Sequence, residues 1–600
     1  MGNASERQLR ARSSLPAGRR PSQGGVSVPK TGASLFTMDQ LEKGIERATD
    51  SLGSRQHPDG YWVFDLEADS TITAEYLLLH FYLGRPLEQQ KTEAIARYLR
   101  RRQLPAGGWP LFEGGEADIS ASVKAYFALK LAGDHPDLPH MIKARNHILR
   151  KGGAVKVNVF TRITLALFGQ LPWRTLPAMP VEIMLLPEWF FFHLHKVSYW
   201  SRTVIVPLLI LHVQRPVLDL TPEQGVAELF VELPGKLGNL DEFSPGRYRK
   251  NSFLLLDRLL KRVEPFMPGS LRHKAIQRAE SWTRKRMGVG GIGAIFPAMA
   301  NAVMALKCLG YSDAHPDMRR GLQAIDDLVA ERRDECFCQP CNSPIWDSAL
   351  GLAAVLEAGV DSDHEVVQRA TTWLLAQQHT GKGDWAVRNP YLEPGGWAFQ
   401  FENSFYPDVD DTSMVLLSLR RSGQNEYSME DQDFARAVRW IIGMQSSDGG
   451  WGAFDIDNNY LYLNDIPFAD HGALLDPSTS DLTARCIELL ATLGHHKDYS
   501  PIAKGLQFLQ REQEECGAWY GRWGVNYIYG TWSVLSALRA LGEDMTQPYI
   551  QKAVQWLKSC QNVDYGWGES CYSYDDPALA GRGPSTPSQT AWALLGLMGA

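Results

Sequence analysis

One short pattern, Gln-x-x-x-Gly-x-Trp, recurs through the chain and constrains the fold more than any other feature of the sequence. A helix-like stretch precedes each copy and a second amphipathic stretch follows it, with apolar residues at helical spacing. Many of these stretches end in glycine, which is common just after a helix. Intact copies start at Gln56, Gln103, Gln445 and Gln513, and degenerate copies run from Gln378 to Trp385 and from Gln561 to Trp567.

The repeat predicts an all-α protein. A single helix–turn–helix unit cannot bury its apolar face alone, so the units must stack or close into a ring, which gives an α/α-barrel. Within each turn, we expect the glycine to allow a tight bend, the tryptophan to cover the helix end and the glutamine to hydrogen-bond backbone groups there. Because 600 residues are too many for one hydrophobic core, we expect two large domains, or three.

The first 35 residues differ in composition from the rest of the chain. They combine basic residues with Ser, Gly and Pro and contain no apolar block, which a signal peptide needs. We therefore expect residues 1–35 to be a disordered basic leader and the protein not to be exported. The net charge of −7, with no stretch rich in both lysine and aromatic residues, argues against a nucleic-acid partner. The eight cysteines fit a reducing compartment.

Two apolar runs and the segment between them suggest contact with a membrane. No run approaches the ~18 apolar residues that span a bilayer. Residues 163–173 and 203–213 are nevertheless apolar, and residues 185–195 include Phe190, Phe191 and Phe192 in succession. Buried core helices are one interpretation, and a monotopic patch that enters one leaflet is the other. A helix would spread three successive phenylalanines over more than one face, so burial alone explains them poorly.

An acidic triplet, Asp408, Asp410 and Asp411, precedes an apolar helix at residues 413–419. The structural interpretation is a helix N-cap with two further acids that the helix dipole favours. The functional interpretation rests on the many aromatic residues at 397–406. Crowded carboxylates cannot all ionise, so one should keep its proton at neutral pH. Such an acid, facing a dry aromatic cavity, can protonate a double bond, and each ring face stabilises the resulting cation by about 0.5–2 kcal/mol.

The repeats and several longer strings resemble the bacterial squalene–hopene cyclase family. The likeness covers residues 36–600 and includes DVDDTS, SPIWDSAL, GDWAVRNPYLEPGGWAFQF, MQSSDGGWGAFDIDN, GRWGVNYIYGTWS and STPSQTAWALL. It implies two α/α-barrel domains around a central hydrophobic cavity: residues 36–340, with a membrane-contacting segment at about 180–215, and residues 341–600, which carry the acid motif. It also implies that squalene is cyclised to hopene or hopanol without a metal or nucleotide, by a homodimer on the cytoplasmic face of the membrane.

The resemblance also implies roles for individual residues, carried over by position. Asp410 matches the proton donor, with Asp408 and Asp411 as its partners. Phe468 matches a constriction in the channel that admits the substrate. Aromatic residues of the cavity wall correspond to Trp346, Phe399, Trp523 and Tyr529, and acidic residues of the donor's network correspond to Asp476 and Asp481.

The chain departs from the family pattern at several positions. Arg485 stands where a histidine is described beside the donor, and we expect its charge to keep a neighbouring Asp anionic and make Asp410 more acidic. Phe454 replaces a tyrosine of the cavity wall, Phe296 a polar residue and Thr164 an aromatic one, so product control is expected to differ. The chain also stops at Ala600 inside an apolar helix, from which we expect a C-terminal truncation that leaves the protein unstable or inactive.

Other functional classes fit the sequence less well. Cys336, Cys338 and Cys341 lack a fourth zinc ligand at a familiar spacing. Ser413 and Met414 follow the triplet, so the Asp-Asp-x-x-Asp arrangement of Mg²⁺-dependent diphosphate ionisation is missing. A related cyclase that protonates another polyprene shares the acid motif and stays open as an alternative. A helical-repeat prenyl-binding protein, or a prenyl transferase subunit, also stays open, although the rings around the acid motif argue against both.

Overall fold

Helices dominate the structure, a computed structural model that describes residues 37–600 except 233, 235–236, 238–239, 424–428 and 470–471. The predicted leader, residues 1–35, lies outside the described residues. In the described part of the chain the strands form three short antiparallel pairs: β1 (Trp109–Pro110) with β2 (Ala117–Asp118), β3 (Met287–Gly288) with β4 (Gly291–Ile292), and β5 (Val329–Arg332) with β6 (Glu335–Cys338). The all-α prediction is confirmed.

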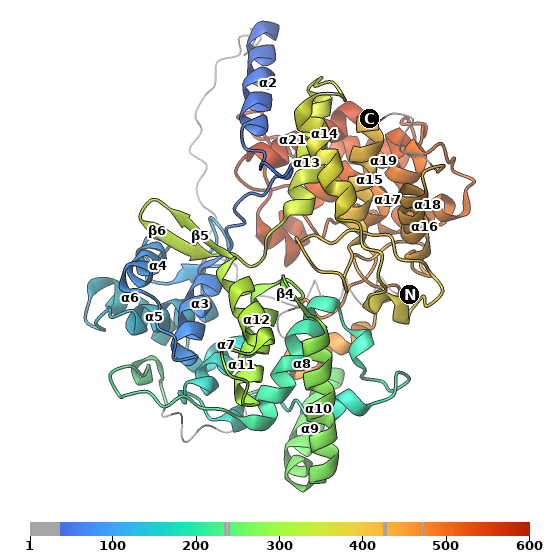
Figure 1. The fold of residues 1–600 in the computed structure, drawn as a ribbon. Helices are drawn as coiled ribbons and strands as arrows, with labels where there is room; N and C mark the ends of the chain where they lie inside the picture. Colours follow the sequence, from blue (N-terminus) through green and yellow to red (C-terminus); the bar gives the residue numbers. More distant parts are fainter. Residues whose placement is uncertain (1–36, 233, 235–236, 238–239, 424–428, 470–471) are drawn as a thin grey trace.

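Two rings of helices form the C-terminal barrel, drawn yellow to red in Figure 1. Neighbouring inner helices contact each other around the ring, and each outer helix packs on the inner helix before it. The inner helices α15 and α17 are buried on nearly all sides, whereas the inner helix α21 and the outer helices bury one face. The inner helices are α13 (Pro344–Glu357), α15 (Val409–Gly423), α17 (Ser480–Thr492), α19 (Tyr527–Ala540) and α21 (Pro587–Gly599); the outer helices are α14 (Glu365–Ala376), α16 (Gln432–Gly443), α18 (Ser500–Glu512) and α20 (Pro548–Ser559).

The N-terminal barrel, blue to green in Figure 1, has the same double-layer plan with less regular packing. Its inner helices are α3 (Ser70–Tyr82), α5 (Ile119–Leu131), α7 (Val159–Leu167), α8 (Tyr199–Gln214) and α11 (Phe296–Cys308). Outside them lie α4 (Gln89–Arg101), α6 (Pro139–Arg150), α10 (Gly269–Lys285) and α12 (Pro316–Asp326). A further helix, α9 (Tyr248–Val263), contacts residues 461–469, a loop that reaches across from the C-terminal half of the chain.

The repeat motif ties neighbouring helix pairs together, as the sequence predicted. In the copy at Gln445, the side-chain amide donates to the carbonyl oxygens of Gly449 and of Pro501 at the start of the next outer helix, at 2.8 and 2.9 Å. The indole of Trp451 donates to the carbonyl of Ile441 in the last turn of α16. The same pattern recurs at Gln56, Gln103 and Gln513.

One degenerate copy was assigned to the wrong tryptophan. The amide of Gln378 donates to the carbonyl of Gly395, and the indole of Trp397 donates to Leu374 at the end of α14. Trp397 therefore occupies the position that the sequence assigned to Trp385. The turn contains a long insertion, residues 379–394. Trp397 therefore lies much farther from Gln378 than the spacing of the repeat predicts.

The first copy of the motif belongs to the other domain from the one predicted. Trp62 packs in the core of the C-terminal barrel, and its backbone N–H donates to the hydroxyl of Ser348 on α13. Helix α2 (Met38–Gly53) also contacts α13 (Figure 1). The predicted domain of residues 36–340 therefore differs from the observed packing at its start, because the motif needs a following outer helix and takes α14 for that purpose.

The segment predicted to contact the membrane, at about 180–215, divides into two parts. Residues of α8 from Tyr199 to His212 are buried, mainly against α10 and α11, so this apolar run is core. The preceding loop is different, because Trp189 and Phe191 are exposed. In the described part of the chain, no helix combines the length and the apolar character needed to cross a bilayer.

Candidate active site

The acid motif lies where a loop enters the inner helix α15. The carboxylate of Asp408 accepts hydrogen bonds from the backbone N–H groups of Asp410 and Asp411, at 2.6 and 3.1 Å, and so caps the helix. The N-cap interpretation is therefore correct for Asp408. It does not account for Asp410 and Asp411. Both are buried inside the barrel with Asp408, whereas acids at a solvated helix start would be exposed.

Arg485 of α17 supplies the cation beside the motif. Its Nε lies 2.5 Å from Oδ1 of Asp410, and its Nη2 donates to the hydroxyl of Tyr529 at 2.9 Å. The sequence predicted a positive neighbour, and the structure places it directly on Asp410. The guanidinium also lies over the rings of Trp346 and Trp532, at 5.3 and 5.9 Å from their centres. Asp410 and its partner cation are thus enclosed by aromatic rings.

The three carboxyls differ in acidity. Burial and the neighbouring carboxylates raise the pKa of Asp408 and of Asp411 well above its usual range. Burial also raises the pKa of Asp410, but Arg485 acts in the opposite direction. The triplet therefore retains a proton at neutral pH, and Asp410 is the carboxyl whose ionised form is stabilised by a cation.

A second group of rings lies on the other side of the motif, where the two domains meet. Phe454 contacts Tyr199 at 4.1 Å, Trp200 at 5.8 Å and Trp523 at 6.3 Å between ring centres. Tyr199 also stacks on Tyr406 at 4.7 Å. The structure thus brings the predicted residues Phe454 and Trp523 together, although Trp523 is 42% exposed. Phe399 is half-buried on the segment that leads from Trp397 to Asp408.

Asp476 and Asp481, which the sequence assigned to the donor's network, hold loops in place. The carboxylate of Asp476 accepts three backbone N–H groups from residues 453–455, the turn that carries Phe454. The carboxylate of Asp481 accepts the N–H groups of Arg522 and Trp523. Burial raises the pKa of Asp476 to about 6. Neither carboxylate bonds to Asp410: the charge of Asp481 raises the pKa of Asp410, and the charge of Asp476 raises that of Asp408.

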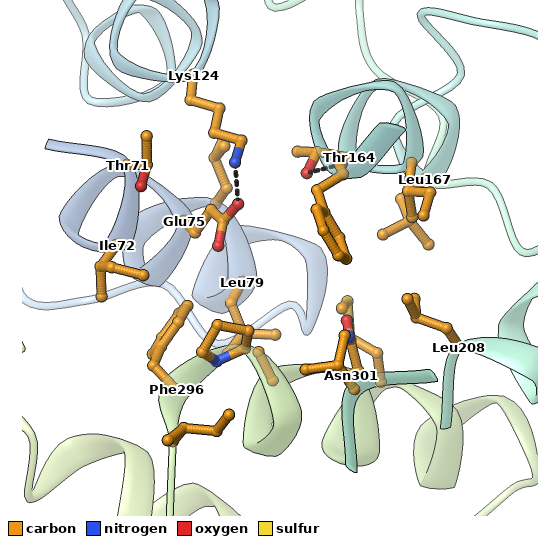
Figure 2. Close-up of a pocket in the computed structure, with 18 of the residues that line it drawn as sticks. Thr71, Ile72, Glu75, Leu79, Lys124, Thr164, Leu167, Leu208, Phe296 and Asn301 are labelled. Carbon is orange, nitrogen blue, oxygen red and sulfur yellow. Dashed lines mark hydrogen bonds and ion pairs between the residues drawn. The ribbon is translucent and has the colours of Figure 1, made fainter. Parts of the chain in front are cut away.

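A cavity of about 380 Å³ lies in the N-terminal barrel, within the usual size range of ligand pockets, ~300–1,000 Å³. Apolar side chains of α3, α7, α8 and α11 make up most of its wall (Figure 2). Trp200 lines it and connects it to the ring group around Phe454, so the acid motif lies beyond these rings. Phe296 and Thr164, the two departures noted in the sequence, both face this cavity.

One end of the cavity is polar, a feature that the sequence analysis missed. Lys124 of α5 and Glu75 of α3 form an ion pair of 2.5 Å beside Thr71 (Figure 2). Lys124 is buried, and Glu75 is partly buried. Asn158 and Asn301 also line this cavity. The only available signal was a charged residue inside each of two otherwise apolar inner helices, and a salt bridge on the surface would have looked the same.

A second hollow of about 330 Å³ adjoins the first and is almost wholly apolar. Phe468 and Ile205 line both hollows, so they stand between them. The other wall residues include Phe190, Phe191 and Phe192, and they come from the loop before α8 and from α9. Large apolar side chains are exposed on the same segments, namely Trp189, Phe191, Phe243, Tyr248, Leu255, Leu259, Val263 and Phe266.

Among the described residues, no three His, Cys, Asp or Glu side chains are grouped so that they could hold a metal ion. Cys336 and Cys338 lie in strand β6 and are buried. Burial raises the pKa of the Cys336 thiol to about 11 and that of Cys341 to about 12, so both stay protonated at neutral pH. Cys336 and Cys338 are therefore part of the packed strand, and none of the three cysteines lines either hollow.

Known protein families match nearly the whole chain. The squalene-hopene cyclase N-terminal domain matches residues 45–334, and the squalene-hopene cyclase C-terminal domain matches residues 342–600. A squalene–hopene cyclase of Zymomonas mobilis is 51% identical over 574 residues, which cover 93% of this chain and 86% of that protein. One from Bradyrhizobium diazoefficiens is 48% identical over 570 residues, with coverage of 93% and 86%.

Among solved structures, an ent-copalyl diphosphate synthase of Streptomyces platensis matches with a TM-score of 0.47 and 15% identity, over 94% of this chain and 93% of that one. The two domain matches together span both barrels, and the match to the Zymomonas mobilis cyclase covers 93% of this chain. The chain therefore belongs to the squalene–hopene cyclase family of class II terpene cyclases.

Proposed function

We propose that this protein cyclises squalene to hopene or hopanol, and that it starts by transferring a proton from Asp410 to a terminal double bond. One observation carries the proposal: a buried carboxyl with a raised pKa lies against a buried arginine among aromatic rings. Burial keeps the proton on this carboxyl, Arg485 stabilises the carboxylate that the transfer leaves behind, and the rings stabilise the cation formed from the alkene. We propose squalene as the substrate because the bacterial relatives are named squalene–hopene cyclases.

The first step follows from this geometry. The π electrons of the terminal alkene form a new C–H bond with the Asp410 proton, and the O–H electrons stay on the carboxylate. Arg485 stabilises that carboxylate at 2.5 Å. The carbon that loses its π electrons becomes a tertiary cation, which the next double bond attacks. The raised pKa values of Asp408 and Asp411 keep a proton within the triplet, and a proton from solvent restores Asp410 after turnover.

The polar end of the cavity is suited to the last step. After successive ring closures the positive charge lies at the far end of the folded chain, which reaches into the N-terminal barrel. There the carboxylate of Glu75, paired with Lys124, is a base among apolar walls. It can accept a proton from the carbon next to the cation, and the C–H electrons then form the alkene of hopene. Attack of a water molecule on the cation at the same end, with loss of one of its protons to Glu75, gives hopanol.

The second hollow is suited to substrate access from a membrane. It is apolar, it adjoins the cavity at Phe468, and exposed apolar side chains of α9 and of residues 189–191 surround its wall segments. Squalene dissolves in lipid, so a route from a leaflet avoids water. We propose that this surface sits in one leaflet on the cytoplasmic face of the membrane, and that the protein acts there as the homodimer that the family resemblance implies.

The test is an assay of purified protein with squalene in detergent, with and without a chelator. We expect pentacyclic products that are indifferent to the chelator. Asp410→Asn keeps the shape of the side chain and removes its acid, so it should lower the rate by about 10²–10⁴-fold. Asp433→Asn is the matched control, because Asp433 is an exposed acid near the start of α16. Product that survives Asp410→Asn would assign the acid elsewhere, and rings from another polyprene alone would make this a related cyclase.

A further inference from the structure

Five side chains meet in a buried cluster between the two barrels, which we term the interdomain cluster. Arg202 of α8 and Arg286 at the end of α10 belong to the N-terminal barrel, and Asp384, Tyr406 and Asp455 belong to the C-terminal barrel. Arg202 forms two hydrogen bonds with Asp455, at 2.9 and 3.2 Å, and its Nε lies 3.5 Å from Asp384. Arg286 pairs with Asp384 and donates to the hydroxyl of Tyr406.

The interdomain cluster is largely buried and electrically balanced. Arg202 is 1% exposed, and Asp384 and Asp455 are buried with it. Two guanidinium groups face two carboxylates, and the Tyr406 hydroxyl donates to Asp384 at 2.8 Å. Burial alone would raise the pKa of Asp384, but Arg202 and Arg286 lower it below its usual value. Buried charges of this kind hold a fixed geometry, because moving one partner leaves the other unpaired.

Two short paths lead from the interdomain cluster to the proton donor. Asp455 ends the turn that begins at Ala453, and the carbonyl of Ala453 accepts the backbone N–H of Val409 at 2.8 Å. Val409 is the first residue of α15, next to Asp410. The second path starts at Tyr406, which is two residues before the capping Asp408 in the same loop. Both sides of the chain entering α15 are thus tied to arginines of the other barrel.

We propose that Arg202 and Arg286 are positioning residues that set the place of the Asp410 carboxyl relative to the substrate cavity. This inference rests on the proposed function. The donor belongs to the C-terminal barrel, whereas the cavity walls come mainly from helices of the N-terminal barrel. The distance between acid and alkene therefore depends on how the two domains meet, and an error of about 1 Å in such a distance can cost about 10²-fold in rate.

The test compares two substitutions that each break a two-pronged arginine–carboxylate contact. Arg202→Lys keeps the charge and loses the fork towards Asp455. Arg100→Lys is the matched control: Arg100 contacts Asp134 through two nitrogens, at 3.0 and 2.5 Å, within the N-terminal barrel. Each variant is assayed with squalene and with its terminal epoxide, and thermal unfolding is followed in parallel. The epoxide is easier to protonate, so its reaction depends less on where the acid lies.

We expect Arg202→Lys to lower kcat on squalene at least tenfold with KM within about twofold of wild type, and to lower kcat on the epoxide much less. Arg100→Lys should leave both rates near wild type even if its melting temperature falls. An unchanged kcat for Arg202→Lys, or an equal loss on both substrates, would overturn the inference. Asp455→Asn, which breaks the same contact from the other side, decides the matter if Arg202→Lys does not fold. Failure of wild type to cyclise squalene would instead refute the proposed function.

Discussion

The contact between Arg485 and Asp410 makes the acid stronger than burial alone would, because the guanidinium lowers the pKa that burial raises. Burial holds the proton on the carboxyl, and the guanidinium stabilises the carboxylate that remains after the proton has left. The two effects oppose each other in the resting protein. In the reaction they cooperate, since the proton is present when the alkene arrives and the charge left behind is neutralised.

Substitution of Arg485 by Met should separate these two effects. Removing the cation removes the influence that lowers the pKa of Asp410, so this pKa rises further and the loss of activity on the alkaline side moves to higher pH. The rate itself should fall by about 10²-fold or more, because a weaker acid protonates an alkene more slowly. The measurement is kcat against pH for both proteins. Arg485→Lys keeps a charge, so its pH profile should lie between those of wild type and Arg485→Met. A shift of the alkaline limb to lower pH in Arg485→Met would contradict this account.

At the residue scale, the sequence identified the acid motif because three acids among rings are unusual, and the resemblance added Arg485. It could not place Arg485 on Asp410 itself, since the two are 75 positions apart and their contact depends on the packing of α15 on α17. Nor did it find Glu75 and Lys124. A charged residue in an amphipathic pattern is usually solvated, and only the closed barrel turns these two inwards.

Among the elements, the repeat turn depends on close backbone contact. Gly449 has a φ of 92°, and a Cβ there would lie 2.6 Å from the carbonyl oxygen of Lys504 on the next outer helix. A left-handed conformation and a backbone collision therefore coincide at this glycine. The motif fixes not only its own turn but also the spacing between successive helix pairs.

Gly449→Ala should therefore destabilise the protein more than an alanine at an otherwise similar turn. Gly494 is the matched control, because its φ is 85° and nothing lies within 4 Å of its added Cβ. We expect a loss of about 1–2 kcal/mol for Gly494→Ala from the backbone conformation alone. Gly449→Ala adds the collision, for a further ~1–3 kcal/mol. Urea unfolding of both variants provides the measurement, and equal losses would show that the backbone contact adds nothing.

The helices and their order could be predicted because each carries its own apolar periodicity. The tryptophan that closes each turn could not be predicted as reliably. The close spacing of Gln-x-x-x-Gly-x-Trp predicted Trp385 as the tryptophan of the repeat that begins at Gln378. In the structure, Trp397 takes this position, after the long insertion. Short-range pattern fixes a helix, whereas the identity of the residue that closes a turn depends on what packs against it.

For the whole molecule, the exposed apolar surface on one side is the feature that sequence alone left open. The apolar run at 203–213 is core, and the exposed residues come from α9 and from the loop before α8. Hydropathy could not separate these two, because burial in a barrel and contact with lipid select the same side chains. The first repeat likewise packs in the C-terminal barrel, although the N-terminal barrel follows it in the sequence.

Replacing Trp189 and Phe266 by Ser should weaken binding to lipid vesicles at least tenfold. Their side chains are 80% and 83% exposed, respectively, on the proposed membrane surface. Removing a fully buried apolar side chain from lipid costs about 1.5–3 kcal/mol. A tenfold loss of binding is therefore a lower bound for two such side chains. Tyr391 and Val563 of the C-terminal barrel are 94% and 88% exposed, and Tyr391→Ser with Val563→Ser is the matched control. Co-sedimentation with vesicles measures binding, and equal binding by both double variants would remove this surface from the proposal.

On the proposed route, squalene and its product both pass between the two hollows, whose shared wall residues are Phe468 and Ile205. Squalene rotates about its many single bonds and can thread a narrow opening a few atoms at a time. The fused pentacycle has lost that freedom and must leave as a rigid body. We therefore expect product release, governed by the swing of one phenylalanine, to limit turnover once the chemistry is complete.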